Sequence, residues 1–232
     1  MCDIMKIRIN KYIQRYAGIS RRQADKLIER GIVKIDGVKA SLGDTVIIGR
    51  QTVTIDGEKI IPHKRNNIYI VMNKPVGYIC SRKGNKTVFD ILPSRFNSLS
   101  YIGRLDVNTS GVLLFTDDGD FIDKILRSNV PRVYYVRLNS ILDEDAISLL
   151  KKGPMLDGRP VKLGKINIKG SEVVMEIYEG RWREVRRIFG SLGYSVLEIC
   201  RTEFGNIKLG NLKTGRIRQL TELEIRNLRK FT

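Results

Sequence analysis

The sequence predicts an α+β protein in two parts: a small N-terminal helix-plus-hairpin domain, followed by a larger, mainly antiparallel mixed α+β domain. Two short N-terminal segments place apolar residues at helical spacing, and short strands that end in Asp-Gly pairs follow them. Beyond residue 68, strand-like segments outnumber helical ones without the strict alternation of parallel α/β proteins. A polar, basic stretch separates the two parts. We therefore expect domains at residues 1–60 and 68–232, joined by a linker at 61–67.

The N-terminal domain begins with two helices that carry clear boundary signals. An apolar stripe builds the first helix, and Gly18 ends it. Ser20 and Gln23 have the spacing of a capping box at the start of the second helix, and Gly31 suits a left-handed cap at its end. Residues 33–35, Asp36-Gly37 and Val38 then predict a hairpin. We expect a second strand pair from residues 45–48 and 52–55. The apolar stripe of the first helix consists of Ile9, Tyr12, Ile13, Tyr16 and Ala17, and that of the second of Ala24, Leu27 and Ile28.

The larger domain reads as strands interrupted by helices. A buried strand at 68–72 ends at Asn73-Lys74-Pro75, and an apolar strand at 112–115 ends at the turn Asp117-Asp118-Gly119. Further strands are expected at 133–138, 166–168, 173–178, 195–200 and 207–209, and helices near 121–127, 143–152, 183–192 and 222–229.

Composition points to a polyanionic partner. The 232 residues contain 42 Lys and Arg against 25 Asp and Glu, a formal net charge of +17. Both predicted domains are basic, so we expect both to touch the same polyanion. No apolar run reaches membrane-spanning length and no secretory signal is recognised, so a cytoplasmic protein without membrane contact is expected.

The few cysteines and the single histidine limit the chemistry. Cys2, Cys80 and Cys200 are an odd number without paired spacing, which argues against a disulfide framework and a zinc site. His63 is the only imidazole, so sites built on several histidines are excluded. We expect no metal, and chemistry by carboxylate, hydroxyl, Tyr, Lys and Arg groups.

The stretch from Gly103 to Gly119 holds the strongest functional signal. It places Asp106 in a polar loop between Gly103 and Gly111, followed by an apolar strand. An isolated Asp in a loop most often makes an Asx turn. The whole stretch, however, resembles the catalytic motif of bacterial ribosomal RNA pseudouridine synthases of the RsuA/RluB type. The resemblance implies that Asp106 is the nucleophile.

Two further segments resemble motifs of the same family. Residues 131–136 resemble the second motif, which implies that Tyr134 stacks on the uracil, although the neighbouring Tyr135 leaves the register open. Residues 179–189 resemble the third motif, which implies that Arg186 points at the active site and pairs with Asp106. Ion pairing or phosphate contact is the alternative, and it suits Arg181, Arg183 and Arg187 better. Trp182, Val185, Ile188 and Phe189 are expected to form the buried stripe of this helix, and Glu184 to contact an arginine.

Residues 6 to about 50 resemble the small RNA-binding domain of ribosomal protein S-four. The Ser-Arg-Arg-Gln-Ala helix start and the Val-Lys-Ile-Asp-Gly hairpin carry this resemblance. It implies RNA-backbone contacts, whereas the plain alternative is a solvated basic face. The residues implied are Arg21, Arg22, Lys26 and Lys34.

Together the resemblances imply an isomerase that converts uridine to pseudouridine in ribosomal RNA, with large-subunit RNA favoured over small-subunit RNA. The reaction needs no cofactor, because it involves neither a redox change nor net hydrolysis. We expect a monomer that acts on free RNA or on an assembling ribosomal subunit, with Arg104 filling the stack that the uridine leaves. A catalytically idle RNA-binding assembly factor and a hydrolase that releases uracil are the alternatives.

Overall fold

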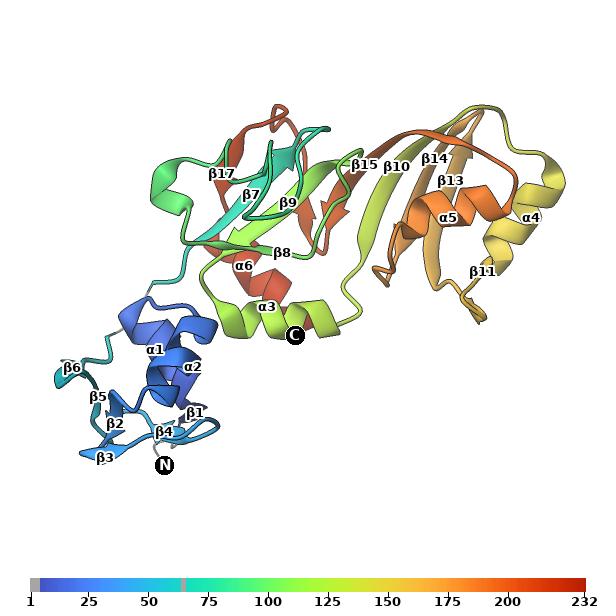
Figure 1. The fold of residues 1–232 in the computed structure, drawn as a ribbon. Helices are drawn as coiled ribbons and strands as arrows, with labels where there is room; N and C mark the ends of the chain where they lie inside the picture. The colour runs from blue at the N-terminus through green and yellow to red at the C-terminus, as the bar shows by residue number, and fades with distance from the viewer. Residues whose placement is uncertain (1–4, 64–65) are drawn as a thin grey trace. The chain divides into compact units, whose positions relative to one another are not determined.

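A computed structural model of the chain describes residues 5–63 and 66–232. It divides into two compact units, Met1–Asn66 (unit 1) and Asn67–Thr232 (unit 2), each described separately below (Figure 1). Residues 64 and 65 of the predicted linker, and Cys2, lie outside the described residues.

Unit 1 contains the two predicted helices with the predicted ends. Gly18 follows the first helix at φ 73°, in the left-handed region that glycine adopts most easily. Ser20 and Gln23 form the capping box, with the Gln23 backbone N–H donating to the Ser20 hydroxyl at 3.3 Å. The elements are β1 (Lys6–Arg8), α1 (Ile9–Ala17), α2 (Arg21–Glu29), β2 (Val33–Ile35), β3 (Val38–Lys39), β4 (Thr45–Ile47), β5 (Val53–Ile55) and β6 (Glu58–Ile60).

The strand pairing in unit 1 differs from the prediction at one place. The hairpin of β2 and β3 forms as expected, with positive φ at both Asp36 and Gly37 in its turn. The expected pair of β4 and β5 is wrong, because β4 pairs with β1, and β5 lies between β2 and β6. The backbone N–H groups of Arg50 and Gln51 donate to the Ile47 carbonyl, and this turn leads the chain from one small sheet to the other.

Unit 2 is built on one large sheet with the strand order β13-β14-β10-β15-β9-β7-β17, to which β16 and β8 add at β15 and β9. Neighbouring strands pair antiparallel except β15 and β9, which are parallel, so the predicted mainly antiparallel α+β fold is confirmed. The strands are β7 (Tyr69–Lys74), β8 (Ser100–Ile102), β9 (Ser110–Thr116), β10 (Arg132–Leu138), β11 (Met155–Leu156), β12 (Arg159–Pro160), β13 (Leu163–Lys169), β14 (Glu172–Ile177), β15 (Val196–Phe204), β16 (Ile207–Lys208) and β17 (Ile217–Gln219). The helices are α3 (Gly119–Arg127), α4 (Glu144–Lys152), α5 (Glu184–Ser191) and α6 (Glu222–Leu228), with 3-10 turns at Ser94–Phe96 and Arg229–Phe231.

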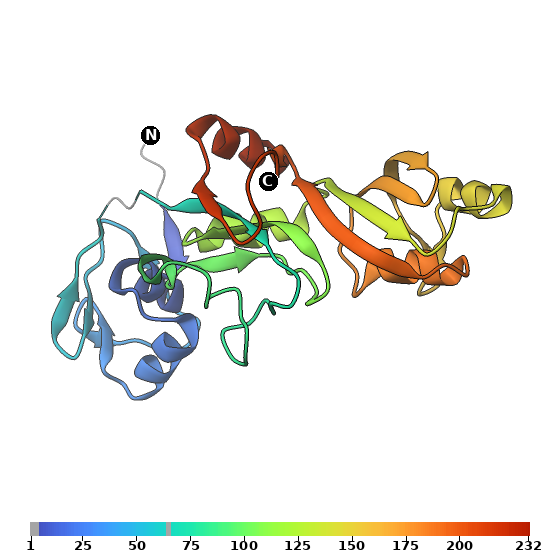
Figure 2. The same cartoon turned by 90° about the horizontal axis from the view of Figure 1, so that it is seen from above.

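The helices of unit 2 cover different parts of the sheet. α4 and α5 share a core with β10 and β14, whereas α3 and α6 pack on β7 and β9. The long strand β15 connects these two halves, and Figure 2 shows it from above. Short polar side chains begin the helices, since Asp118, Asp143 and Thr221 each accept a backbone N–H of the first turn. No helix in residues 5–63 or 66–232 is long and apolar enough to cross a bilayer.

The parallel contact between β9 and β15 depends on Gly111. Only two residue pairs, Cys200–Ser110 and Arg201–Gly111, make this contact in register. Gly111 has φ 107°, and a Cβ atom there would lie 2.2 Å from the carbonyl oxygen of Arg201. No residue with a side chain fits this approach, so the second glycine of the 103–119 stretch brings its loop against β15.

Candidate active site

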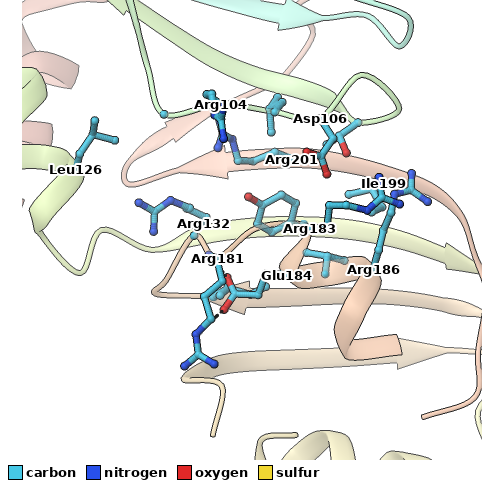
Figure 3. A pocket seen from close by; sticks show the side chains of 17 residues that line it. Arg104, Asp106, Leu126, Arg132, Arg181, Arg183, Glu184, Arg186, Ile199 and Arg201 are labelled. Atoms are coloured by element: carbon cyan, nitrogen blue, oxygen red, sulfur yellow. Dashed lines mark hydrogen bonds and ion pairs between the residues drawn. The ribbon is translucent and has the colours of Figure 1, made fainter. Parts of the chain in front are cut away.

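A pocket of about 230 Å³ opens beside the contact of β9 and β15 (Figure 3). Its walls come from the 103–109 loop, α3, β10, the 180–186 segment and β15. Its charged side chains are those of Arg104, Asp106, Arg132, Arg181, Arg183, Glu184, Arg186 and Arg201. Six arginines therefore face two carboxylates, an excess of positive charge that attracts a polyanion.

Backbone contacts fix the loop that carries Asp106. The ammonium of Lys74 donates to the carbonyl oxygens of Asp106 at 3.0 Å and Thr109 at 2.9 Å. On the other side of the loop, the buried Leu105 anchors it in the core, and its backbone N–H donates to Cys80 Sγ at 3.4 Å. The half-buried Asp106 side chain points from this loop into the pocket, on the same side as Arg183 and Arg186 (Figure 3). Rigid presentation of this carboxylate is what a nucleophile requires.

Lys74 is a site residue that sequence reasoning missed. We expected Asn73-Lys74-Pro75 only to end a strand, yet Lys74 is the last residue of β7 and is fully buried. Burial lowers the pKa of Lys74 to about 8, although the nearby Cys80 and Asp106 charges act in the opposite direction. The basic residue at the end of a buried strand was the available signal.

Strand alternation places Tyr134 and Tyr135 on opposite faces of β10. Tyr134 lines the pocket and pairs in register with Arg201 on β15. Tyr135 instead donates its hydroxyl to Glu172 Oε1 on β14 at 2.9 Å. Of these two residues it is Tyr134 that shares the pocket with Asp106.

Arg186 reaches the pocket from α5, but its contacts differ from the expected pairing. Its Nη1 donates to the Val196 carbonyl at 3.0 Å and its Nη2 to the Asn108 carbonyl at 2.9 Å. The predicted ion pair with Asp106 is not formed between these two described residues: both Nη groups donate to backbone oxygens, and the buried Nε has no hydrogen-bond partner among the described residues. Burial and the Arg183 charge lower the pKa of Arg186, while the charge of Asp106 raises it. Arg186 therefore ties α5 to the loop that carries Asp106.

Two of the arginines expected to contact RNA have partners inside the protein. Arg181 donates to the Leu156 carbonyl at 2.7 Å, the Pro160 carbonyl at 3.2 Å and Glu179 Oε2 at 2.9 Å. These bonds fasten the hairpin of β11 and β12. Arg187 forms a bidentate pair with Asp157 at 3.0 and 2.5 Å. Arg104 and Arg183 differ from both, since their side chains are exposed at the pocket.

Sequence reasoning also missed two buried arginines in the pocket. Arg132 donates to the carbonyls of Tyr178 and Glu179 at 3.2 and 3.0 Å. Arg201 is 2 % exposed and donates through Nε to the Val112 carbonyl at 2.8 Å, while its buried Nη2 has no hydrogen-bond partner among the described residues. The strand around Arg201 also contains Glu198 and Glu203, so its sequence gave no signal that this arginine is buried.

The expected contact of Glu184 with an arginine is present. Arg181 donates its backbone N–H to Glu184 Oε2 at 3.1 Å, and its Nε lies 3.8 Å from Oε1, which is too long for a hydrogen bond. Burial raises the pKa of Glu184.

The expected burial of Trp182 is wrong. Its side chain is 70 % exposed. The reason is the helix start: α5 begins only at Glu184, and Arg183 before it has φ 47°. Trp182 therefore lies outside the helical repeat that buries Val185, Ile188 and Phe189.

The predicted RNA contacts of unit 1 lie on α2 and β2. Arg22, Lys26 and Lys34 are exposed, whereas Arg21 is half-buried and donates from Nε to Gln14 Oε1 at 2.9 Å. Ala24 and Ile28, on the opposite face of α2, are buried.

In the part of the chain that the structure describes, no three His, Cys, Asp or Glu side chains gather in a way that could hold a metal ion.

Comparisons with known proteins identify the family of this chain. The RNA pseudouridylate synthase family matches residues 68–191, more than half of the chain, and the S4 domain matches residues 7–51. An uncharacterized RNA pseudouridine synthase of Aquifex aeolicus is 34% identical over 98% of this chain and 95% of its own length. The ribosomal large subunit pseudouridine synthase B of Bacillus subtilis is 31% identical over 96% and 95% of the two chains. A crystal structure of a pseudouridylate synthase superposes with a TM-score of 0.70 at 31% identity, covering 96% of this chain and 99% of the other. The chain thus belongs to the RNA pseudouridine synthases, and its N-terminal part to the S4 domains.

Proposed function

We propose that this isomerase converts uridine to pseudouridine in ribosomal RNA, preferentially large-subunit RNA, with Asp106 as the nucleophile. The observation that carries the proposal is the placement of the Asp106 carboxylate in an arginine-lined pocket beside Tyr134. Relatives from Yersinia pestis and Bacillus subtilis that bear the name ribosomal large subunit pseudouridine synthase B support the choice of RNA.

The pocket suits the chemistry of this isomerisation. Uracil must leave C1′ of its ribose, turn while it stays bound, and rejoin the ribose through C5. A carboxylate that attacks the ribose or the base divides this exchange into two easier steps, as in other covalent mechanisms. The pocket, at about 230 Å³, lies below the roughly 300–1,000 Å³ of drug-sized ligand sites and suits one nucleobase. A small pocket also keeps water from the freed base.

The other side chains of the pocket support Asp106. Tyr134 stacks on the uracil, a contact worth about 1–3 kcal/mol for a base on an aromatic ring. That energy offsets part of the few kcal/mol needed, roughly, to flip the uridine out of its stack. Arg186 holds the loop through the Asn108 carbonyl and lends its positive charge to Asp106. Arg104, exposed beside the nucleophile, fills the space that the uridine leaves.

The remaining cations bind the RNA backbone. We assign this role to the exposed Arg183 in unit 2 and to the predicted residues of unit 1, because Lys and Arg groups that pair with phosphates release counterions from them. The unit 1 residues are Arg21, Arg22, Lys26 and Lys34. The protein acts as a monomer, on free ribosomal RNA or on an assembling subunit, and binding weakens steeply with salt.

Asp106→Asn tests the proposal, because it keeps the shape of the side chain and removes the negative charge. We expect RNA binding to persist and pseudouridine formation to be abolished, as measured by mapping pseudouridine in ribosomal RNA. Asp145→Asn, which changes an exposed acid on α4, serves as the matched control with full activity. Modification that survives in Asp106→Asn refutes the nucleophile assignment.

Mass spectrometry of the product separates the alternatives. Isomerisation leaves the RNA mass unchanged, whereas a hydrolase releases free uracil. If the protein is instead an idle assembly factor, the wild type and Asp106→Asn bind RNA equally well, and neither makes pseudouridine.

A further inference from the structure

Trp182 is the one tryptophan of the chain, and its side chain is 70 % exposed. A tryptophan offers a large aromatic face for contact, and this residue type is enriched at binding interfaces. The residues before and after it, Arg181 and Arg183, both line the pocket, whereas Trp182 does not. Trp182 therefore lies between two pocket-lining residues along the chain, while its own side chain is not part of the pocket lining.

The backbone presents this ring away from the core. Arg183 has φ 47° and ψ 35°, a left-handed conformation that an L-residue with a long side chain rarely adopts. Because α5 begins after this turn, Val185 and Ile188 enter the core and Trp182 does not. The guanidinium carbon of Arg183 lies 5.8 Å from the centre of the Trp182 ring, so an exposed cation accompanies the exposed aromatic surface.

An aromatic ring next to a cation recognises a specific kind of ligand. Single-stranded nucleic acids present flat bases that stack on aromatic rings and phosphates that pair with arginines. The net charge of +17 and the six arginines of the adjoining pocket favour this polyanion over an acidic or neutral protein surface.

We propose that Trp182 stacks on the base of a nucleotide that flanks the target uridine, and so helps to select the RNA segment that enters the site. This inference rests on the proposed function for the identity of the target. Stacking itself requires only an unpaired base next to the pocket. Trp182 is a binding and selection residue, so its loss weakens RNA binding and leaves the chemical step intact.

Tryptophan emission tests the stacking directly, because residue 182 is the only tryptophan. We expect single-stranded oligouridylate to quench the emission of the full chain, after correction for absorbance by the RNA. The titration is repeated in Asp106→Asn, which binds RNA but does not modify it. If the emission stays unchanged at RNA concentrations that saturate binding, the base does not stack on Trp182 and the proposal is overturned.

Two variants then measure the effect on binding and on rate. Trp182→Ala should weaken RNA binding by about 5- to 150-fold, the range for losing one base–aromatic stack. Trp182→Phe, which keeps an aromatic ring, should recover most of the affinity. Ile141→Ala changes another exposed apolar residue, 71% exposed before α4, and should leave RNA binding unchanged. An equal loss in Ile141→Ala, or none in Trp182→Ala, contradicts the proposal.

Salt and saturation distinguish stacking from charge and from misfolding. Trp182→Ala should keep the wild-type slope of log affinity against log salt, whereas Arg183→Ala should reduce that slope by about 1. In single-turnover experiments Trp182→Ala should form pseudouridine more slowly than the wild type only at RNA concentrations that do not saturate the protein. A lower rate that persists at saturating RNA shows that the side chain acts on the chemical step and contradicts the proposal.

Abasic substrates identify the stacked nucleotide. An abasic site at the flanking position should weaken binding to the wild type as much as Trp182→Ala does, and add no further loss in that variant. Additive losses at every flanking position refute stacking. If the wild type forms no pseudouridine but RNA still quenches the emission of both the wild type and Asp106→Asn, the proposed function fails and the stacking surface stands.

Discussion

Replacing Gly111 with alanine tests how the loop that carries Asp106 is brought against β15. A Cβ atom at residue 111 would lie 2.2 Å from the carbonyl oxygen of Arg201 and 2.7 Å from its backbone nitrogen. Both atoms belong to the backbone of β15, so no side-chain rotation relieves the clash. The strands β9 and β15 must separate, and only two residue pairs hold them in register.

The expected magnitude follows from comparing the two glycines of the same stretch. Gly103 has φ 69° and its nearest neighbour for an added Cβ is Leu126 Cδ2 at 3.8 Å, an ordinary contact. Gly103→Ala should therefore cost only the left-handed strain, about 1–2 kcal/mol. Gly111→Ala adds an overpacking cost of about 1–3 kcal/mol to strain of about 1–3 kcal/mol at φ 107°. We expect a loss of about 2–6 kcal/mol in the free energy of unfolding.

Urea unfolding of the two variants measures the difference in the free energy of unfolding, and hydrogen exchange locates it. Amides of β9 and β15 should lose protection in Gly111→Ala and keep it in Gly103→Ala. Pseudouridine formation should fall further in Gly111→Ala, because a displaced carboxylate lies outside its reactive geometry. If both variants lose the same stability, or if β15 stays protected in Gly111→Ala, the close approach of the strands does not position the loop.

Two further predictions concern buried ionisable groups. Burial lowers the pKa of Lys74 from 10.5 to about 8. Between pH 8 and pH 10.5 the unfolded chain therefore holds a proton on Lys74 that the folded chain has lost. Lys74 thus makes the free energy of unfolding rise with pH in this range. The neutral amine holds the Asp106 and Thr109 carbonyls less strongly, so single-turnover activity should fall as the pH rises through about 8. Lys74→Met should lose the pH dependence of both stability and activity. A wild-type rate that stays flat to about pH 10 contradicts this role of Lys74. Burial raises the pKa of Glu184 above the ordinary 4.5. Just above pH 4.5 the folded chain therefore keeps a proton on Glu184 that the unfolded chain has lost. As the pH rises through this range, Glu184 lowers the free energy of unfolding. Glu184→Gln, which keeps an acceptor for the Arg181 N–H, should remove that decline in urea titrations at several pH values, whereas Glu184→Ala should lower stability at every pH; a decline that persists in Glu184→Gln assigns it to another group.

The sequence predicted best where structure is decided by neighbouring residues. The capping box of Ser20 and Gln23 and the turn at Asp36-Gly37 depend on side chains within three positions, and both formed as expected. The partner of β4 is β1, some forty residues away along the chain, and no local pattern specifies that choice. The same limit applies to Trp182, whose exposure depends on where α5 begins rather than on the spacing of apolar residues.

The candidate site follows the same division. Motif resemblance located Asp106, Tyr134 and Arg186, and the fold brings all three to one pocket. The contacts of Arg186 could not be predicted, because the carbonyls of Val196 and Asn108 reach it only after β15 and the loop have packed against α5. Lys74 and Arg201 were missed because their burial depends on tertiary packing that a strand pattern does not reveal.

The six arginines of the pocket fall into two groups. Four of them, Arg132, Arg181, Arg186 and Arg201, donate to backbone carbonyls, so their charges are fixed around the reacting groups before RNA arrives. Fixed charges need no reorganisation during the reaction, which is the property that makes an electrostatic site effective. Arg104 and Arg183 are exposed instead and can adjust to a bound strand. We therefore expect Arg183 to account for the pocket's share of the salt dependence of RNA binding, and the four fixed arginines to account for the electrostatics around Asp106.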